Sequence, residues 1–168
     1  MSIGIFYGST NGNTAEAASM IQKQLGADSY DVGKLKSGAE LAQYDLLIFG
    51  TSTWYDGELQ DDWESFTVHL SKADLSGKKV ALFGMGDQEG YGSDYVSAMR
   101  VLYDKAIEQG ACVIGAWNNE GYSFDHSASI VDGKFVGLAL DEDNQSELTA
   151  GRIDAWCKQI EAEMKACA

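Results

Sequence analysis

The sequence predicts an α/β fold in which a doubly wound, five-stranded parallel sheet carries helices on both faces. Four short runs are apolar nearly throughout, at residues 3–7, 46–50, 80–84 and 112–116. Continuous apolar runs are typical of strands that are covered on both sides. The segments between them carry helical periodicity, and strands that alternate with helices indicate a parallel sheet. A length of 168 residues corresponds to a single domain, 1–168.

The first half of the chain supplies two strands of this sheet and one helix. Residues 3–7 (IGIFY) form the first strand, and the weaker run 29–32 forms the second. Between them an apolar stripe at helical spacing predicts a helix, from Ala17, Ala18, Ile21 and Leu25. Gly26 follows this stripe, as a glycine that ends a helix does.

The second half continues the alternation and then interrupts it. Residues 46–50, 80–84 and 112–116 give the remaining strands, in the predicted sheet order 2-1-3-4-5. One helical stripe precedes Gly110 and is formed by Val96, Met99, Tyr103 and Ala106. Another lies near the end of the chain and is formed by Ile153, Trp156, Cys157, Ile160 and Met164. The polar segment 117–134 is predicted to be a loop inserted in the last strand, which resumes at VGLAL.

The charge of the chain excludes several classes of partner. Twelve Lys and Arg against 26 Asp and Glu give a net charge of −14, which disfavours nucleic acid and anionic membranes. No apolar run approaches the roughly 20 residues of a membrane span, and the first ten residues lack the pattern of a signal peptide. We therefore expect a cytoplasmic protein. Cys112, Cys157 and Cys167 have no metal-binding or disulfide spacing.

The loop after the first strand has the composition of an anion-binding turn. GSTNGNT, at residues 8–14, contains only small or hydrogen-bonding residues and leads directly into a helix. Backbone N–H groups and the helix dipole favour an anion at such a position. The loop lacks the Lys of a triphosphate-binding loop, so a single phosphate group suits it better. A plain turn with a helix cap is the alternative interpretation.

Two further loops at the same sheet edge carry aromatic residues. TSTWYDG follows the third strand, and MGDQEGYGSDY follows the fourth. Large aromatic side chains exposed near a switch point favour stacking against a flat ring. The second of these loops fails the dinucleotide pattern, because Glu89 stands where the third glycine belongs. A phosphate loop with two aromatic loops therefore predicts FMN. A receiver domain is excluded, because Gly50 and Thr51 stand where its acceptor Asp would be.

Four motifs in order resemble those of flavodoxins, from Ile3 to about Ile160. They are GSTNGNT, TSTWYDGELQDDWE, FGMGDQEGYGSDY and GKFVGLALDEDNQSELT. The last motif and the inserted segment resemble the long-chain group of that family. This chain departs from the family at Ser52, where Pro is common, at Tyr55, where a small or amide residue is common, and at Asp94, where Asn is common.

The resemblance implies a set of FMN-binding residues. The phosphate would bind Ser9, Thr10, Asn11, Gly12, Asn13 and Thr14. The ring would lie between Trp54 and Tyr91. Further contacts are implied for Ser52, Thr53, Tyr55, Asp56, Gly57, Met85, Gly86, Asp87, Asp94 and Asp143. No catalytic residue and no metal ligand is implied.

The resemblance also implies a low-potential one-electron carrier, not an enzyme. Its expected partners are basic redox proteins of the flavodoxin/ferredoxin–NADP reductase type, with photosystem I, nitrogenase and radical-enzyme systems as other partners of the family. We expect a monomer. The alternative is an FMN-dependent NAD(P)H quinone or azo reductase of the same fold, although Tyr91 would cover the ring face that a hydride donor needs. A non-redox flavin-binding module is a further alternative.

Overall fold

The computed structural model describes residues 2–166, so Cys167 lies outside the described residues. It confirms the predicted α/β class, with a parallel sheet in the order β2-β1-β3-β5-β6. Counting only these parallel strands along the chain, the order is the predicted 2-1-3-4-5. The bounds are β1 (Ile3–Tyr7), β2 (Asp28–Asp31), β3 (Leu46–Trp54), β5 (Lys79–Met85) and β6 (Cys112–Val113), while the short β4 (Glu58–Leu59) pairs antiparallel with β3.

The fifth position of the sheet is shared by two short strands. β6 pairs with the beginning of β5, and β9 (Leu138–Leu140) pairs with its end. The prediction of a strand through residue 116 is wrong beyond Val113, because Gly115 has φ 85° and turns the chain away. The insertion between the two strands is confirmed. It contains a small hairpin of β7 (Ile130–Val131) and β8 (Lys134–Phe135).

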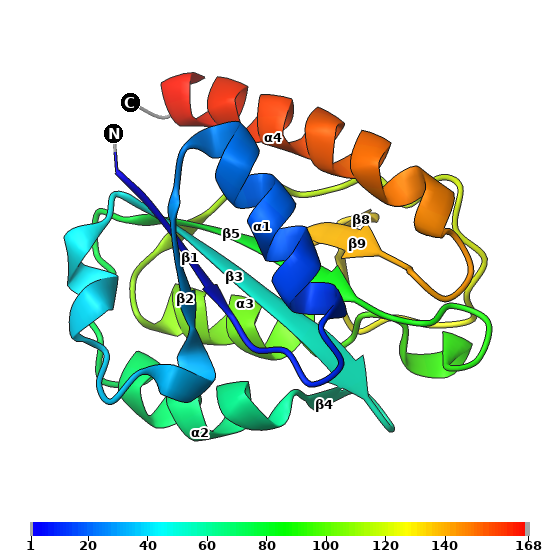
Figure 1. Ribbon diagram of the computed structural model, residues 1–168, viewed down its shortest axis with the longest axis horizontal. Helices are drawn as coiled ribbons and strands as arrows, with labels where there is room; N and C mark the ends of the chain where they lie inside the picture. The colour runs from blue at the N-terminus through cyan, green and yellow to red at the C-terminus, as the bar shows by residue number, and fades with distance from the viewer. Residues whose placement is uncertain (1, 167–168) are drawn as a thin grey trace.

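Helices cover both faces of the sheet (Figure 1). α1 (Asn13–Leu25) and α4 (Thr149–Ala166) lie on one face, and α2 (Asp61–Leu70) and α3 (Met99–Glu108) lie on the other. Four short 3₁₀ turns connect these elements, at Val32–Lys34, Ala39–Gln43, Gly92–Asp94 and Ser146–Leu148. In the described range 2–166, no helix is both long and apolar enough to cross a membrane.

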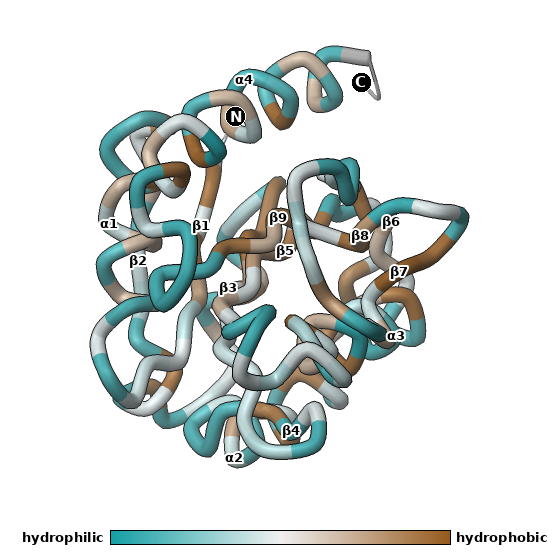
Figure 2. Tube along the Cα trace, turned by 90° about the vertical axis from the view of Figure 1, so that its right-hand side faces the viewer, coloured by the Kyte–Doolittle hydropathy of each residue, from teal (hydrophilic) through white to brown (hydrophobic). Residues whose placement is uncertain are grey.

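Alternation along each strand divides the core into two halves. Ile5 and Ile48 are fully buried beneath α1 and α4, whereas their neighbours Phe6 and Phe49 are fully buried beneath α2 and α3. The central strands β1, β3 and β5 must therefore be apolar at nearly every position, which explains the continuous runs in the sequence. In Figure 2, hydrophobic residues gather in the central strands, and hydrophilic residues lie along the outer turns.

The helix ends follow the predicted signals with one exception. Gly26 has φ 66° and ends α1, where its N–H donates to the carbonyl oxygen of Gln22 at 2.9 Å. Gly110 has φ 94° just beyond the end of α3. Val96, however, lies before α3 and not within it. Its φ of 48° is a left-handed conformation that helical periodicity alone does not reveal.

Candidate functional site

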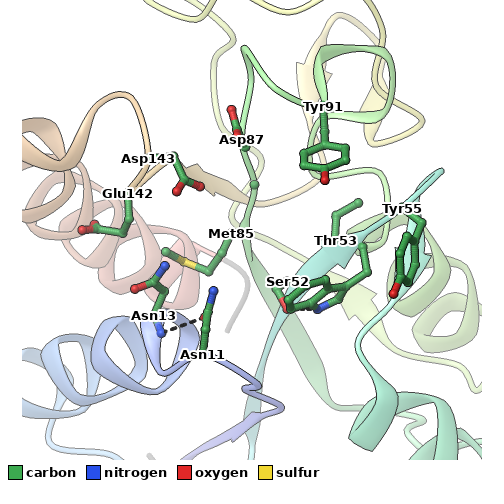
Figure 3. A pocket seen from close by; sticks show the side chains of 12 residues that line it. Asn11, Asn13, Ser52, Thr53, Tyr55, Met85, Asp87, Tyr91, Glu142 and Asp143 are labelled. Atoms are coloured by element: carbon green, nitrogen blue, oxygen red, sulfur yellow. Dashed lines mark hydrogen bonds between the residues drawn. The ribbon is translucent and has the colours of Figure 1, made fainter.

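A cleft of about 260 Å³ lies at the carboxyl ends of β1, β3, β5 and β9 (Figure 3). This edge is where open α/β sheets bind their ligands. Loops from both halves of the chain form the cleft, and its lining residues are Asn11, Asn13, Ser52, Thr53, Trp54, Tyr55, Met85, Gly86, Asp87, Tyr91, Glu142 and Asp143.

The loop of residues 8–14 wraps around the first turn of α1. Gly12 has φ 95°, a left-handed conformation that suits glycine. The Ser9 hydroxyl oxygen accepts the N–H of Gly12 at 3.1 Å and that of Ala15 at 3.4 Å. The Asn11 side chain accepts the N–H of Asn13 at 3.3 Å (Figure 3). These bonds bend the chain so that the positive end of α1 lies beside the cleft.

Thr14 gives this loop a buried hydroxyl that suits a ligand. Its side chain is fully buried, and its Oγ1 has no hydrogen-bond partner among the described residues. An unsatisfied buried hydroxyl costs free energy unless another molecule supplies the missing partner. A hydroxyl at the N-terminus of a helix suits a phosphate oxygen. The loop therefore has the chemistry of a phosphate-binding site.

The second loop begins where β3 extends past its predicted end at Gly50. β3 continues to Trp54 because β5 and β4 pair with its last residues, and Trp54 lies opposite Glu58. The indole N–H of Trp54 donates to the Ser52 hydroxyl at 2.8 Å, which holds the ring at the cleft. Tyr55 then turns the chain with φ 47°, a conformation that costs a non-glycine residue about 1–2 kcal/mol.

Tyr55 and Tyr91 stand at the mouth of the cleft (Figure 3). These two residues are 70% and 61% exposed, although large apolar rings are usually covered. Trp54 is half-buried and also lines the cleft. The cleft thus presents three aromatic side chains to a ligand, which suits a flat ring system.

A buried carboxylate anchors the third loop. Asp141 is fully buried and accepts five N–H groups, from Gln88 N, Gln88 Nε2, Asp143 N, Asn144 N and Asn144 Nδ2. Gln88 accepts the N–H of Ser123 in return, within the inserted segment. The insertion and the loop that carries Tyr91 are therefore joined through one polar network.

Carboxylates dominate the side of the cleft opposite the tyrosines. Hydrogen bonds from the N–H of Gly90, then from Asn144 and Glu89, lower the pKa of Asp87 despite partial burial. Partial burial and nearby carboxylates instead raise the pKa of Asp143; these neighbours are Asp87, Asp141 and Glu142. The structure thus places an anionic edge beside the cleft and no cationic side chain among its lining residues.

The structure gathers most of the predicted site residues around this cleft. Ser9, Thr10, Gly12, Thr14, Asp56, Gly57 and Asp94 are not among its lining residues. The first four belong to the turn around α1. Asp94 lies behind Gly57, because a Cβ built on Gly57 would lie 3.4 Å from the Asp94 carboxylate. Sequence reasoning missed Glu142, although it follows the last strand at the same sheet edge. It also missed Gln60, whose buried side chain reaches the first loop.

Comparison with known proteins agrees with this geometry. The family model described as "Flavodoxin" matches residues 5–156. The chain belongs to the flavodoxin family. Flavodoxin 1 of Escherichia coli is 48% identical to this flavodoxin over 165 residues, which cover 96% of this chain and 93% of that protein. The flavodoxin of Haemophilus influenzae is 46% identical over 165 residues, with coverages of 96% and 95%.

A solved structure of the same family extends the comparison to three dimensions. The Fusobacterium nucleatum flavodoxin bound to flavin mononucleotide superposes on this flavodoxin with a TM-score of 0.90 and 34% identity. The match covers 96% of this chain and 98% of that one. The fold prediction is therefore confirmed.

Proposed function

We propose that this flavodoxin, as one domain of residues 1–168, carries single electrons on a non-covalently bound FMN. The observation that carries this proposal is the meeting of a phosphate-binding turn and three aromatic side chains in one cleft. FMN, when bound, accepts and releases electrons one at a time. The flavodoxin bound to flavin mononucleotide from Fusobacterium nucleatum supports the same cofactor.

The chain's own residues fit each part of FMN. Residues Ser9, Thr10, Asn11, Gly12, Asn13 and Thr14 would hold the phosphate, which would give the Thr14 hydroxyl the partner that no described residue supplies. Trp54 and Tyr91 would cover the ring and exclude water from it. The polar edge of the ring would lie against Ser52, Thr53, Tyr55, Asp56, Gly57, Met85, Gly86 and Asp87, with Asp94 and Asp143 nearby.

The partners we propose are redox proteins with basic docking faces, such as a flavodoxin/ferredoxin–NADP reductase. Asp56, Glu58, Asp61 and Glu64 lie on exposed positions between β3 and the first turn of α2. A cluster of one charge beside a redox site steers partners of the opposite charge. We propose that the protein works in the cytoplasm as a monomer.

Flavin binding and turnover test the proposal together. The purified protein should be yellow and should bind one FMN, and it should bind riboflavin at least about tenfold more weakly, because riboflavin leaves the phosphate loop unpaired. The protein alone should not oxidise NADPH, but it should accept electrons when a basic reductase is added. Rapid NADPH oxidation without a reductase would instead favour a quinone or azo reductase.

A further inference from the structure

Gln60 joins the first turn of α2 to the phosphate-binding loop, although it does not line the cleft. Its side chain is only 1% exposed. Its Oε1 accepts the N–H groups of Asp62 at 3.0 Å and Trp63 at 3.3 Å, which caps the helix. Its Nε2 lies 3.0 Å from the Asp62 carboxylate and 3.2 Å from the Thr10 hydroxyl oxygen. One buried amide therefore uses both of its ends.

The neighbours of this amide fix its orientation. Backbone N–H groups only donate, so the atom that faces Asp62 N and Trp63 N must be the oxygen. A carboxylate only accepts, so the atom that faces Asp62 Oδ2 must be the nitrogen. The reversed orientation would oppose donor to donor and acceptor to acceptor. Gln60 therefore donates to Thr10.

Packing holds the amide against the start of the loop. A Cβ on Gly8 would lie 2.1 Å from the Oε1 of Gln60 and 2.9 Å from the Trp63 ring, so no larger residue fits there. The Trp63 indole donates to the carbonyl oxygen of Gly50 at 2.7 Å, and the Gly8 N–H donates to the same oxygen at 3.1 Å. The first turn of α2 is thereby fastened to the loop.

The hydrogen bond from Gln60 decides whether the Thr10 hydroxyl donates to or accepts from a ligand. A hydroxyl has one proton, and an incoming N–H occupies one of its acceptor positions. The Thr10 proton then points away from Gln60. Because Thr10 is exposed in the phosphate-binding turn, its proton is free to reach an anion there. The N–H groups of Asp62 and Trp63 polarise the amide from its other side, through Oε1, and hydrogen bonds in such a chain strengthen one another.

We propose that Gln60 is a positioning residue for the phosphate group, acting through a relay from the N–H groups of Asp62 and Trp63 through the Gln60 amide to the Thr10 hydroxyl. The relay presents Thr10 as a hydrogen-bond donor and so favours flavins that carry a phosphate over flavins that do not. This inference rests on the proposed FMN site. It concerns selectivity for the phosphate, whereas the aromatic side chains bind the ring that both kinds of flavin share.

The first experiment measures the ratio of FMN affinity to riboflavin affinity. Gln60→Met removes both ends of the amide at similar size, and we expect the ratio to fall about tenfold, the effect of one hydrogen bond to a charged group. Gln109→Met is the matched control, because Gln109 also makes a tertiary bond, to the Ala73 carbonyl oxygen, far from the cleft. The control should keep the wild-type ratio. Equal weakening of both flavins by Gln60→Met would mean that Gln60 only supports the fold, and would overturn the relay.

A second variant separates the cap from the donor. Gln60→Glu keeps an oxygen to cap α2 but cannot donate to Thr10, so the ratio should still fall. Because its second oxygen faces the Asp62 carboxylate, the apoprotein should also unfold at a lower urea concentration than wild type. Added salt should not restore the ratio if the donor, and not charge repulsion, is responsible. Full recovery in salt would overturn the relay.

A double-mutant cycle and a simpler ligand complete the test. Thr10→Val removes the hydroxyl, and in that background Gln60→Met should have no further effect on the ratio. Independent, additive losses would overturn the relay.

Inorganic phosphate alone should raise the melting temperature of the wild-type apoprotein, and it should raise that of Gln60→Met less. If wild type binds neither flavin, but phosphate still stabilises it more than Gln60→Met, the proposed function fails and the relay stands. If phosphate stabilises both forms equally, the relay fails.

Discussion

The side-chain amide of Gln88 donates a hydrogen bond of 2.7 Å to the carboxylate of Asp141, and both side chains are buried. Gln88 precedes Tyr91 in the third loop, and Asp141 follows the last strand. The same glutamine accepts the N–H of Ser123 from the inserted segment. This pair therefore holds the outer wall of the cleft to the insertion, and it links the position of Tyr91 to a segment that does not line the site.

Replacing Asp141 should destabilise the protein strongly. Asp141→Asn turns one acceptor oxygen into a donor that faces other donors, and we expect a loss of about 1–3 kcal/mol in the free energy of unfolding. Urea denaturation of the apoprotein measures this loss. Asp104→Asn, at an exposed ion pair with Arg100, should cost less than about 0.5 kcal/mol. Equal midpoints for Asp141→Asn and wild type would contradict the role of this network.

Thr14→Val should keep or raise the stability of the apoprotein while it lowers the affinity for FMN. The substitution removes a buried hydroxyl that has no partner among the described residues. The free energy of unfolding should therefore stay the same or rise by up to about 1 kcal/mol. Its affinity for FMN relative to riboflavin should fall about tenfold. Thr51→Val is the matched control, because the buried Thr51 hydroxyl donates to the Ser52 carbonyl oxygen at 2.9 Å. That control should lose stability, opposite in sign to Thr14→Val.

Trp54→Ala should weaken FMN binding by about 1–3 kcal/mol, by analogy with the stacking of bases on aromatic side chains. Fluorescence of the bound flavin should increase, because the stacked indole no longer quenches it. Titration of the apoprotein with FMN gives both quantities. Trp54 is half-buried, so apoprotein stability should change little. A less stable apoprotein with unchanged bound fluorescence would show that Trp54 serves the core and not the ligand.

Neutralising the acidic cluster beside the cleft should slow electron transfer from a basic reductase. Asp61 and Glu64 are both exposed in the first turn of α2, whereas Asp62 is engaged by Gln60. The double variant Asp61→Asn, Glu64→Gln should reduce the rate at low salt and make it less dependent on salt. Stopped-flow reduction at several ionic strengths measures both effects. Glu108→Gln with Glu161→Gln, on exposed positions of other helices, should leave the rate unchanged.

The raised pKa of Asp143 predicts a pH dependence of stability with a defined sign. The folded state holds this proton more tightly than the unfolded chain, so the group destabilises the fold as pH rises from about 4 through its raised pKa. Asp143→Asn should therefore be more stable than wild type at pH 7. The advantage should vanish below pH 4, where the carboxyl is protonated in both states. Urea midpoints measured from below pH 4 to pH 7 test this prediction. Glu147→Gln is the control, at an exposed position in the same segment.

The sequence by itself determined the alternation of strands and helices and the edge at which the site lies. Residues 3–7 and their equivalents are apolar at every position because each strand packs on both faces, and periodicity records such packing directly. Loop composition was equally informative. Gly8 to Thr14 is a polar turn between a strand and a helix, so its place at the sheet edge followed from connectivity alone.

Only the tertiary structure decided how the last strand is divided and which side chains meet across the chain. β6 ends at Val113 because Gly115 adopts φ 85°, and β9 completes the same position after the insertion. Gln60 bonds to Thr10 across 50 residues, and Gln88 bonds to Asp141 across 53. Sequence patterns report which face of an element is buried. They do not report the direction of a buried amide, which depends on donors and acceptors brought together only when distant segments pack.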